Sequence, residues 1–211
     1  MASAAPLQVR TSEPPLLLLA GPTAVGKTEI ALRLADRLNG EIVSVDSMQI
    51  YRGLDIGTAK PSHAERALVP HHLIDILELQ EGFDANRFVQ LATAVIAEIR
   101  SRARLPILCG GTGLYFKAFL EGLGHSPPGD PALRKQLEQI PLAELLAELK
   151  EKDPASFDRI DRQNPRRVIR AVEVIRLTGR PFSEQRARWG SEPPKNAGCK
   201  APAVLYALTR S

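Results

Sequence analysis

A phosphate-binding motif with the pattern Gly-x-x-x-x-Gly-Lys-Thr occupies residues 21–28. Its glycines allow backbone N–H groups to converge on phosphate oxygens, and the positive end of a following helix adds to that field. Lys27 can reach a terminal phosphate, and the hydroxyl of Thr28 can ligate Mg²⁺. The motif therefore predicts a Mg²⁺-dependent site for a di- or triphosphate. Its members are Gly21, Pro22, Thr23, Ala24, Val25, Gly26, Lys27 and Thr28.

The motif also has the structural context that it needs. An apolar run at 16–20 predicts a buried strand before it, and apolar residues at helical spacing follow it. Strand, glycine-rich turn and helix is the arrangement of a working phosphate-binding loop. A glycine-rich turn without a ligand is the less favoured alternative. The helical face would consist of Ile30, Ala31, Leu34, Ala35 and Leu38.

Asp46 is the candidate catalytic carboxylate. It follows a predicted strand at 41–45, and ligands of open parallel sheets lie beyond the carboxyl ends of the strands. We therefore expect Asp46 beside the phosphate-binding loop, where a carboxylate can accept a proton from a hydroxyl or an amine. The alternative is a carboxylate that holds a Mg²⁺-bound water or Lys27. The segment 47–61, which follows, has no sustained period and is interpreted as an ordered loop.

Two further groups of polar residues were considered as sites. A Gly-Gly-Thr-Gly turn at 110–113 follows a predicted strand at 105–109. Its Thr112 is either a hydroxyl that contacts the ligand or a helix N-cap without a ligand. The histidines lack metal-ligand spacing, which favours loop or surface positions for them over a metal site. Three of the four histidines were considered for such a site: His63, His71 and His72.

Strands and helices alternate along the first 120 residues. A further short strand is expected at 71–75. Asp84 is a good N-cap for the next helix, with Phe83 and Phe88 at the positions of a hydrophobic staple. The alternation predicts an α/β fold with a P-loop NTPase-like parallel sheet and helices on both of its faces.

The composition changes after Gly122, where a linker at 124–131 leads into a helical region. The last of its helices would end at Gly179, and the next strand is expected at 203–208. Each of three helices would begin with an N-cap followed by proline: Asp130-Pro131, Asp153-Pro154 and Asn164-Pro165. We therefore predict a disordered extension at 1–13, a phosphate-binding core at 14–122, a helical insertion at 123–200 and a returning core strand at 201–211.

Arginines gather in the second half of this insertion. Arg166 and Arg170 have i, i+4 spacing, with Arg167 beside them, so the three would share a helix face. They form either a solvated charged surface or a footprint for the phosphates of RNA, whose unpaired bases arginine can also stack on. The cluster consists of Arg159, Arg162, Arg166, Arg167, Arg170, Arg176 and Arg180.

The whole chain has ordinary globular composition and a net charge of +4, which permits an anionic partner without requiring one. Its two cysteines, Cys109 and Cys199, are far apart and are expected to be reduced thiols. No stretch approaches the length of a membrane span. We expect a cytoplasmic monomer.

These motifs together resemble the tRNA dimethylallyltransferase family. The match runs in order from about residue 16 to the end of the chain. Its most specific part is Asp-Ser-x-Gln-x-Tyr-x-Gly-x-Asp-Ile-Gly-Thr-Ala-Lys, which begins at Asp46. The segments that carry the resemblance are 21–28, 45–61, 71–75, 110–115 and 164–167.

The resemblance implies Mg²⁺-dependent transfer of a dimethylallyl group from dimethylallyl diphosphate to tRNA. The acceptor would be the exocyclic N6 amine of the adenosine on the 3′ side of the anticodon. Residues 21–28 would hold the donor diphosphate, with Lys27 and Thr28 acting in catalysis, Thr28 on the metal, and Asp46 as the base. The tRNA-contacting positions implied are Asp46, Ser47, Met48, Gln49, Thr112, Arg134, Arg166, Arg167, Val168, Ile169 and Arg170.

Members of that family continue well beyond the last strand expected here, so the chain is expected to end early relative to them. The part beyond includes an arginine assigned to the leaving diphosphate and further RNA-contacting helices. Two alternatives therefore stay open. One is a small-molecule kinase that uses the same loop for ATP. The other is a shortened, inactive chain that only binds tRNA or a diphosphate.

Overall fold

A computed structural model describes residues 15–187 and 203–209, which belong to two compact units. The first unit contains the described residues up to Leu120 together with 203–209, and the second begins at Glu121. The predicted extension at 1–13 lies outside the described residues. The division follows Leu120, whereas the predicted boundary followed Gly122. The two units are described separately below.

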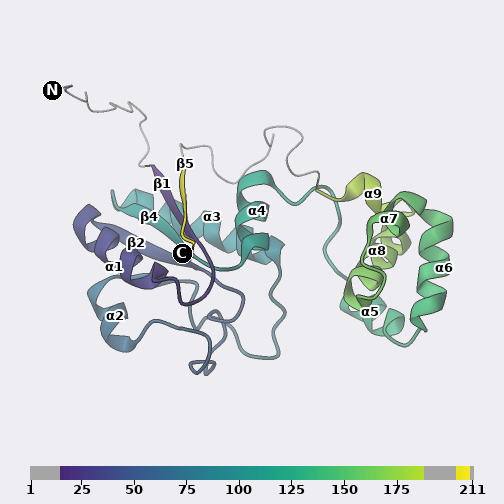
Figure 1. The fold of residues 1–211 in the computed structure, drawn as a ribbon, viewed down its shortest axis with the longest axis horizontal. Coiled ribbons are helices and arrows are strands. Elements are labelled where there is room, and N and C mark those ends of the chain that lie inside the picture. Colours follow the sequence, from purple (N-terminus) through teal and green to yellow (C-terminus); the bar gives the residue numbers. More distant parts are fainter. Residues whose placement is uncertain (1–14, 188–202, 210–211) are drawn as a thin grey trace. The chain divides into compact units, whose positions relative to one another are not determined.

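A parallel sheet forms the centre of the first unit (Figure 1). Its strands lie in the order β3-β2-β4-β1-β5, and every neighbouring pair is parallel. This confirms the predicted fold class. The strand expected at 71–75 is much shorter, because Leu73 and Asp75 take positive φ angles of 59° and 56°, which end an extended backbone. The strands are β1 (Leu16–Ala20), β2 (Gly40–Val45), β3 (His71–His72), β4 (Leu105–Gly110) and β5 (Ala203–Ala207).

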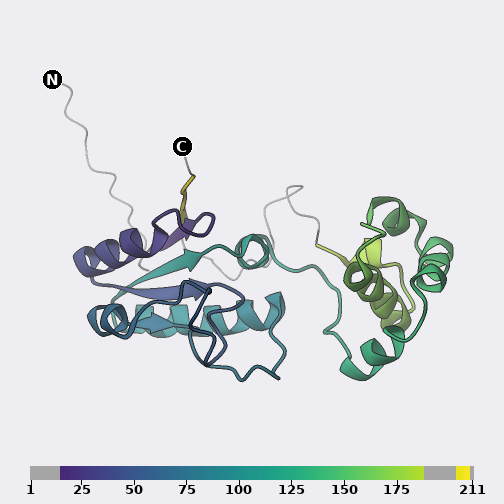
Figure 2. The same cartoon turned by 60° about the horizontal axis from the view of Figure 1, so that its bottom comes forward.

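Helices cover both faces of this sheet, with α1 on one side and α3 on the other (Figure 2). Asp84 caps α3 as predicted, accepting a hydrogen bond from the Arg87 backbone N–H. The predicted face of α1 is partly wrong. Its small alanines pack on the sheet, whereas Ile30 and Leu38 are exposed at 36% and 51%. The helices are α1 (Lys27–Leu38), α2 (His63–Leu68), α3 (Ala85–Ser101) and α4 (Gly113–Glu121).

The segment 47–61 lacks helix and contains a single β-bridge, at Tyr51, in agreement with the predicted ordered loop. The helix α2 that follows was not predicted. Its signal is a capping box in which Ser62 and Glu65 each bond the backbone N–H of the other. This short pattern was overlooked because α2 buries no residue and so has no apolar face.

The described part of the second unit is helical. The three predicted N-caps are confirmed, and α8 ends at Gly179 with a φ of 68°. The helix α6 was missed because no side chain caps it, although its leucines have helical spacing. These helices enclose a core of leucine, isoleucine and valine. Their bounds are α5 (Pro131–Leu137), α6 (Leu142–Lys152), α7 (Pro154–Arg159), α8 (Pro165–Thr178) and α9 (Phe182–Gln185).

Among the described residues, no helix combines the length and the apolar character needed to cross a bilayer.

Candidate functional site

A cavity of about 1120 Å³ lies in the first unit, beyond the carboxyl ends of β1, β2 and β4. This is the position at which open α/β sheets bind their ligands. Residues from four segments supply most of its lining: the phosphate-binding loop at 22–28, the turn at 46–49, the loop at 54–61 and the turn at 109–112. The structure therefore brings together Lys27, Thr28, Asp46 and Thr112, which the sequence analysis had named separately.

The phosphate-binding loop curls directly into α1. Gly26 is the N-cap, has a φ of 86° and offers no side-chain cap, so the first N–H groups of the helix remain for a ligand. A Cβ on Gly21 would lie 2.6 Å from the carbonyl oxygen of Leu208. Position 21 therefore favours glycine, because the loop passes close to the backbone just after β5. The Lys27 ammonium donates to the carbonyl oxygen of Pro22, within its own loop. This geometry suits an anion bound at the helix start.

Asp46 directly follows β2 and stabilises the turn that comes next. Its Oδ1 accepts hydrogen bonds from the backbone N–H groups of Met48 (2.8 Å) and Gln49 (3.3 Å). Both bonds use the same oxygen, so Oδ2 is free of these contacts. Asp46 is partly buried in the cavity lining, as is Lys27. A carboxylate fixed in this way can accept a proton from a ligand in the cavity.

Thr112 connects the turn at 109–112 to the turn at 46–49. Its Oγ1 accepts from the Ser47 backbone N–H at 3.2 Å, and its own N–H donates to Val45 at 3.2 Å. A Cβ on Gly110 would lie 2.1 Å from the Val45 carbonyl oxygen, so only glycine permits this approach. Thr112 directly precedes α4, but its hydroxyl oxygen is used by Ser47. The hydroxyl can still donate to a ligand.

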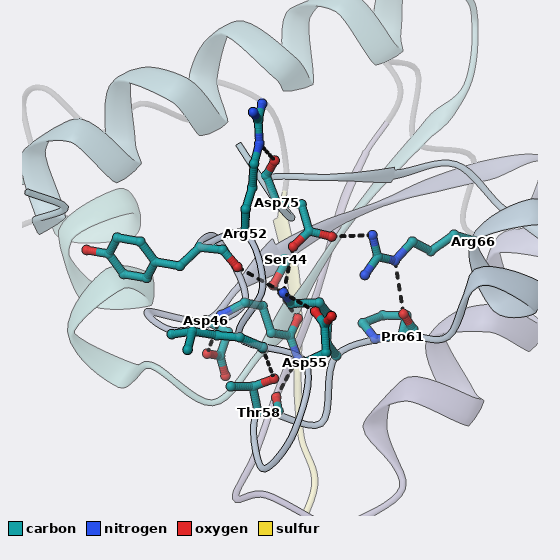
Figure 3. A network of polar contacts seen from close by, with 12 residues as sticks. Ser44, Asp46, Arg52, Asp55, Thr58, Pro61, Arg66 and Asp75 are labelled. Carbon is teal, nitrogen blue, oxygen red and sulfur yellow. Dashed lines mark hydrogen bonds and ion pairs between the residues drawn. The ribbon is translucent and has the colours of Figure 1, made fainter. Parts of the chain in front are cut away.

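Gln49 fastens the outer loop of the cavity. Its Oε1 accepts from the Ser44 hydroxyl at 2.8 Å, and its Nε2 donates to the carbonyl oxygens of Thr58 (3.1 Å) and Ala59 (3.0 Å). Figure 3 shows Ser44, Asp46 and Thr58 gathered in this network. Neither Ser44 nor the 54–59 loop was identified from the sequence as part of the site. The only signal was the specific string at 46–60, whose pattern does not reveal which residues contact one another.

The oxygen atoms that the cavity lining offers suit a Mg²⁺ ion that is held mainly by a bound ligand. The described residues contain no cluster of three or more histidine, cysteine or acidic side chains that could hold a metal ion. The cavity instead offers the hydroxyl of Thr28 and the carboxylate of Asp46. Mg²⁺ prefers oxygen ligands and is commonly bound through few protein groups, several waters and substrate phosphates. These residues fit an ion that arrives with a diphosphate.

His71 and Cys109 also belong to the cavity lining, whereas His63 and His72 do not. His71 and His72 lie in β3 and are partly buried, so the expected loop or surface positions are wrong for these two. His72 contacts the buried carboxylate of Glu41 at 2.6 Å. His63 is exposed at the start of α2. Burial raises the pKa of the Cys109 thiol to about 11, which keeps it protonated beside the cavity.

The predicted RNA-facing arginines in the second unit have unequal surroundings. Arg134 and Arg170 both pair with the buried Glu173, at 2.8 and 2.7 Å. Burial alone would raise the pKa of Glu173, but hydrogen bonds from Arg134 and Arg170 lower it below its usual value. Arg176 pairs with Glu148, which lies on the helix α6 that the sequence analysis missed. The charges of these arginines are therefore partly neutralised within the unit.

Arg166 and Arg167 are exposed at the start of α8 and, among the described residues, take part in no ion pair. Their charges are therefore available to an anionic partner. Val168 and Ile169, by contrast, are 0% and 8% exposed and belong to the core of the unit. Their side chains are not available for contact with RNA, so we do not retain these two positions as side-chain contacts.

Comparison with known proteins gives a consistent result. The protein-family model described as IPP transferase matches residues 49–210. The chain is 53% identical over 178 residues to a tRNA dimethylallyltransferase of Roseiflexus sp. (strain RS-1), covering 82% of this chain and 58% of that protein. It is 56% identical over 174 residues to a tRNA dimethylallyltransferase of Halorhodospira halophila, covering 81% and 56%. The chain thus spans a little more than half the length of the curated relatives it matches.

Solved structures show the same similarity. The full-length tRNA isopentenylpyrophosphate transferase of Bacillus halodurans matches with a TM-score of 0.51 and 48% identity, over 80% of this chain and 57% of that one. A eukaryotic dimethylallyltransferase acting on tRNA matches with a TM-score of 0.74 and 26% identity, over 92% and 48%.

Proposed function

The chain belongs to the IPP transferase family, and from this premise we propose that it transfers a dimethylallyl group from dimethylallyl diphosphate to tRNA. The acceptor is the N6 amine of the adenosine on the 3′ side of the anticodon. The observation that carries this proposal is the shared cavity of the phosphate-binding loop and Asp46. We further propose that the protein acts as a monomer in the cytoplasm.

The reaction breaks the C–O bond between the dimethylallyl group and its diphosphate and forms a C–N bond to the adenine. Positive charge develops on the allylic carbon, and negative charge develops on the departing oxygens. The N–H groups at the start of α1 and the Lys27 ammonium stabilise those oxygens where the charge appears. Thr28 would hold Mg²⁺ together with the diphosphate, and the ion would supply positive charge to the leaving group.

Asp46 accepts the proton that the N6 amine loses as the C–N bond forms. A base in this cavity cannot remain stacked in a helix, so the adenine must be extruded, which favours a loop nucleotide as the target. The turn at 46–49 and Thr112 are proposed to contact that adenine. Arg166 and Arg167, with Arg134 and Arg170, are proposed to contact the tRNA backbone.

A small-molecule kinase is not favoured, because the relatives that match this chain are named as tRNA dimethylallyltransferases. A chain that binds tRNA and diphosphate without transferring the prenyl group is the remaining alternative. It differs from the proposal only in turnover, so ligand binding and product formation must be measured separately.

Thermal unfolding with Mg²⁺ and either dimethylallyl diphosphate or ATP tests the proposed donor. A ligand present at 100 times its dissociation constant adds about 2.7 kcal/mol of stability. For a protein of this size that raises Tm by roughly 5–10 °C. We expect this rise with dimethylallyl diphosphate and a much smaller one with ATP. The reverse order would support the kinase. Incubation with an anticodon stem-loop distinguishes the two remaining hypotheses, because only an active enzyme forms prenylated product.

Lys27→Met is expected to weaken binding of inorganic diphosphate with Mg²⁺. A hydrogen bond to a charged group contributes about 1.5–3 kcal/mol, so the dissociation constant should rise by roughly 10- to 150-fold. Isothermal titration calorimetry measures this change directly. Lys117→Met is the matched control, because Lys117 is an exposed residue outside the cavity lining. An unchanged affinity in Lys27→Met would contradict the role of this loop as the diphosphate site.

A further inference from the structure

Lys60 is a buried lysine at the base of the cavity loop. Its side chain is 2% exposed, and its ammonium donates to the Tyr51 carbonyl oxygen (2.9 Å) and to Oδ1 of Asp55 (2.7 Å) and Asp75 (2.6 Å). An ammonium has three N–H donors, so all of them are used. A lysine is rarely buried unless its charge is paired, and here the pairing joins three separate points of the chain. The reaction proposed above assigns no role to this residue.

Asp75 is the partner of Lys60 that is itself held by several other hydrogen bonds. Its Oδ2 accepts from Arg66 at 2.6 Å, its carbonyl oxygen accepts from Nε of Arg52 at 2.7 Å, and its N–H donates to the Gln49 carbonyl oxygen at 3.1 Å. Figure 3 shows Arg52 and Arg66 reaching Asp75 from different sides. Asp75 follows the short strand β3 closely, so it ties the network to the sheet.

Lys60 and Asp75 remain ionised near neutral pH. Burial alone would lower the pKa of Lys60, but hydrogen bonds to Asp55 and Asp75 and their charges raise it above its usual value. Burial alone would raise the pKa of Asp75, but Lys60 and Arg66 lower it. The connection is therefore a permanent ion-pair network at neutral pH.

The segment closed by Lys60 forms part of the cavity wall. Residues 54 and 56–59 line the cavity, and the segment 54–59 belongs to no helix or strand. Gly57 and Ala59 have positive φ angles of 78° and 50°, and Ile56 is 97% exposed, so local packing does little to fix this loop. Its conformation depends on polar tethers, namely the Gln49 amide, the Thr58 hydroxyl on Leu54 and the Lys60 ammonium.

We propose that Lys60 is a positioning residue whose buried ammonium holds the 54–59 loop in place as a wall of the cavity. On the function proposed above, residues 21–28 hold the diphosphate, so this separate segment of the same cavity lining is left for the part of the donor beyond its diphosphate. The phosphate-binding loop lies on other elements and does not need Lys60 for its shape. Loss of the ammonium should therefore weaken binding of the prenyl group but not of the phosphates.

Lys60→Met tests the positioning role without any ligand, through amide hydrogen exchange. We expect exchange across 54–59 to rise by at least about tenfold, with β2 and β4 changed by less than about twofold. Lys152→Met is the matched control, since it removes an exposed lysine that also pairs with a carboxylate. Unchanged exchange across 54–59 would overturn the proposal.

A second variant keeps the test valid if Lys60→Met destabilises the core by leaving the partly buried Asp75 carboxylate without its lysine partner. Lys60→Met with Asp75→Asn removes both charges together. Local loosening of 54–59 in a folded double variant supports positioning. Exchange that rises equally throughout the sheet of this double variant assigns Lys60 to general stability and overturns the proposal.

Titration with two ligands tests whether the 54–59 loop contributes to binding of the prenyl group. Lys60→Met should bind dimethylallyl diphosphate about tenfold more weakly than wild type and inorganic diphosphate within about twofold. Equal losses for both ligands, or no loss, would overturn the cavity-wall role. If the wild-type protein prefers ATP to dimethylallyl diphosphate, the proposed function fails instead, and the exchange experiment still decides whether Lys60 holds the loop.

Discussion

Asp46→Asn should slow prenyl transfer to an anticodon stem-loop by about 10²- to 10⁴-fold, the usual contribution of a general base. The amide has almost the same shape as the carboxylate and keeps an Oδ1 that accepts from Met48 and Gln49. The turn after β2 is therefore retained, and only the ability to take a proton is lost. Single-turnover kinetics with saturating donor measure the loss at the chemical step.

The two roles considered for Asp46 predict different binding results. A base that acts only on the amine leaves the affinity for inorganic diphosphate within about threefold of wild type. A carboxylate that holds Lys27 or a Mg²⁺-bound water loses diphosphate affinity as strongly as Lys27→Met does. Asp36→Asn serves as the control because it removes an exposed carboxylate of α1 outside the cavity lining. Equal losses of transfer and diphosphate affinity would contradict the assignment of Asp46 as the base.

Glu173→Ala should destabilise the helical unit by about 3 kcal/mol, at the lower end of the range for breaking a buried ion pair. The Glu173 side chain is 0% exposed and accepts from Arg134, Arg170 and the Asp130 backbone N–H. The lower end applies because Arg134 and Arg170 are 45% and 29% exposed, so water can partly solvate them when their partner is removed. Urea denaturation followed by helical circular dichroism measures the change in unfolding free energy.

The exposed ion pair of Arg180 and Glu184 is the control for Glu173→Ala. Glu184→Ala removes the partner of Arg180, where both side chains are at least half exposed, and should change stability by less than about 1 kcal/mol. A similar, small effect of Glu173→Ala would contradict the structural role of the buried carboxylate.

The Glu173 carboxylate also makes the stability of the helical unit depend on pH, in a direction that its pKa shift fixes. The pKa of Glu173 is lower in the folded protein than its ordinary value of 4.5. Its contribution to stability is therefore complete above the unfolded pKa and is lost as the pH falls through the folded one. We expect wild type to lose more stability than Glu173→Gln between neutral pH and acid conditions below pH 4.5.

The sequence by itself determined the fold class and most local boundaries, and it predicts the ligand class. Glycine spacing fixes a phosphate-binding loop through backbone conformation alone, so residues 21–28 could be identified without neighbours. N-caps such as Asp84 and Asn164 act within four residues, which is why the starts of α3 and α8 were correct. The specific string from Asp46 indicated the family directly.

Only the tertiary structure decided how the site is assembled. The contacts of Gln49 with the carbonyl oxygens of Thr58 and Ala59, and of Lys60 with Asp75, join residues whose separations follow no helical or strand period. The partner of Arg134 lies 39 residues away, on another helix. Val168 was expected to meet RNA, yet packing directs it into the core. Local propensity describes neighbours in the chain, whereas burial and ion pairing depend on which segments the fold brings together.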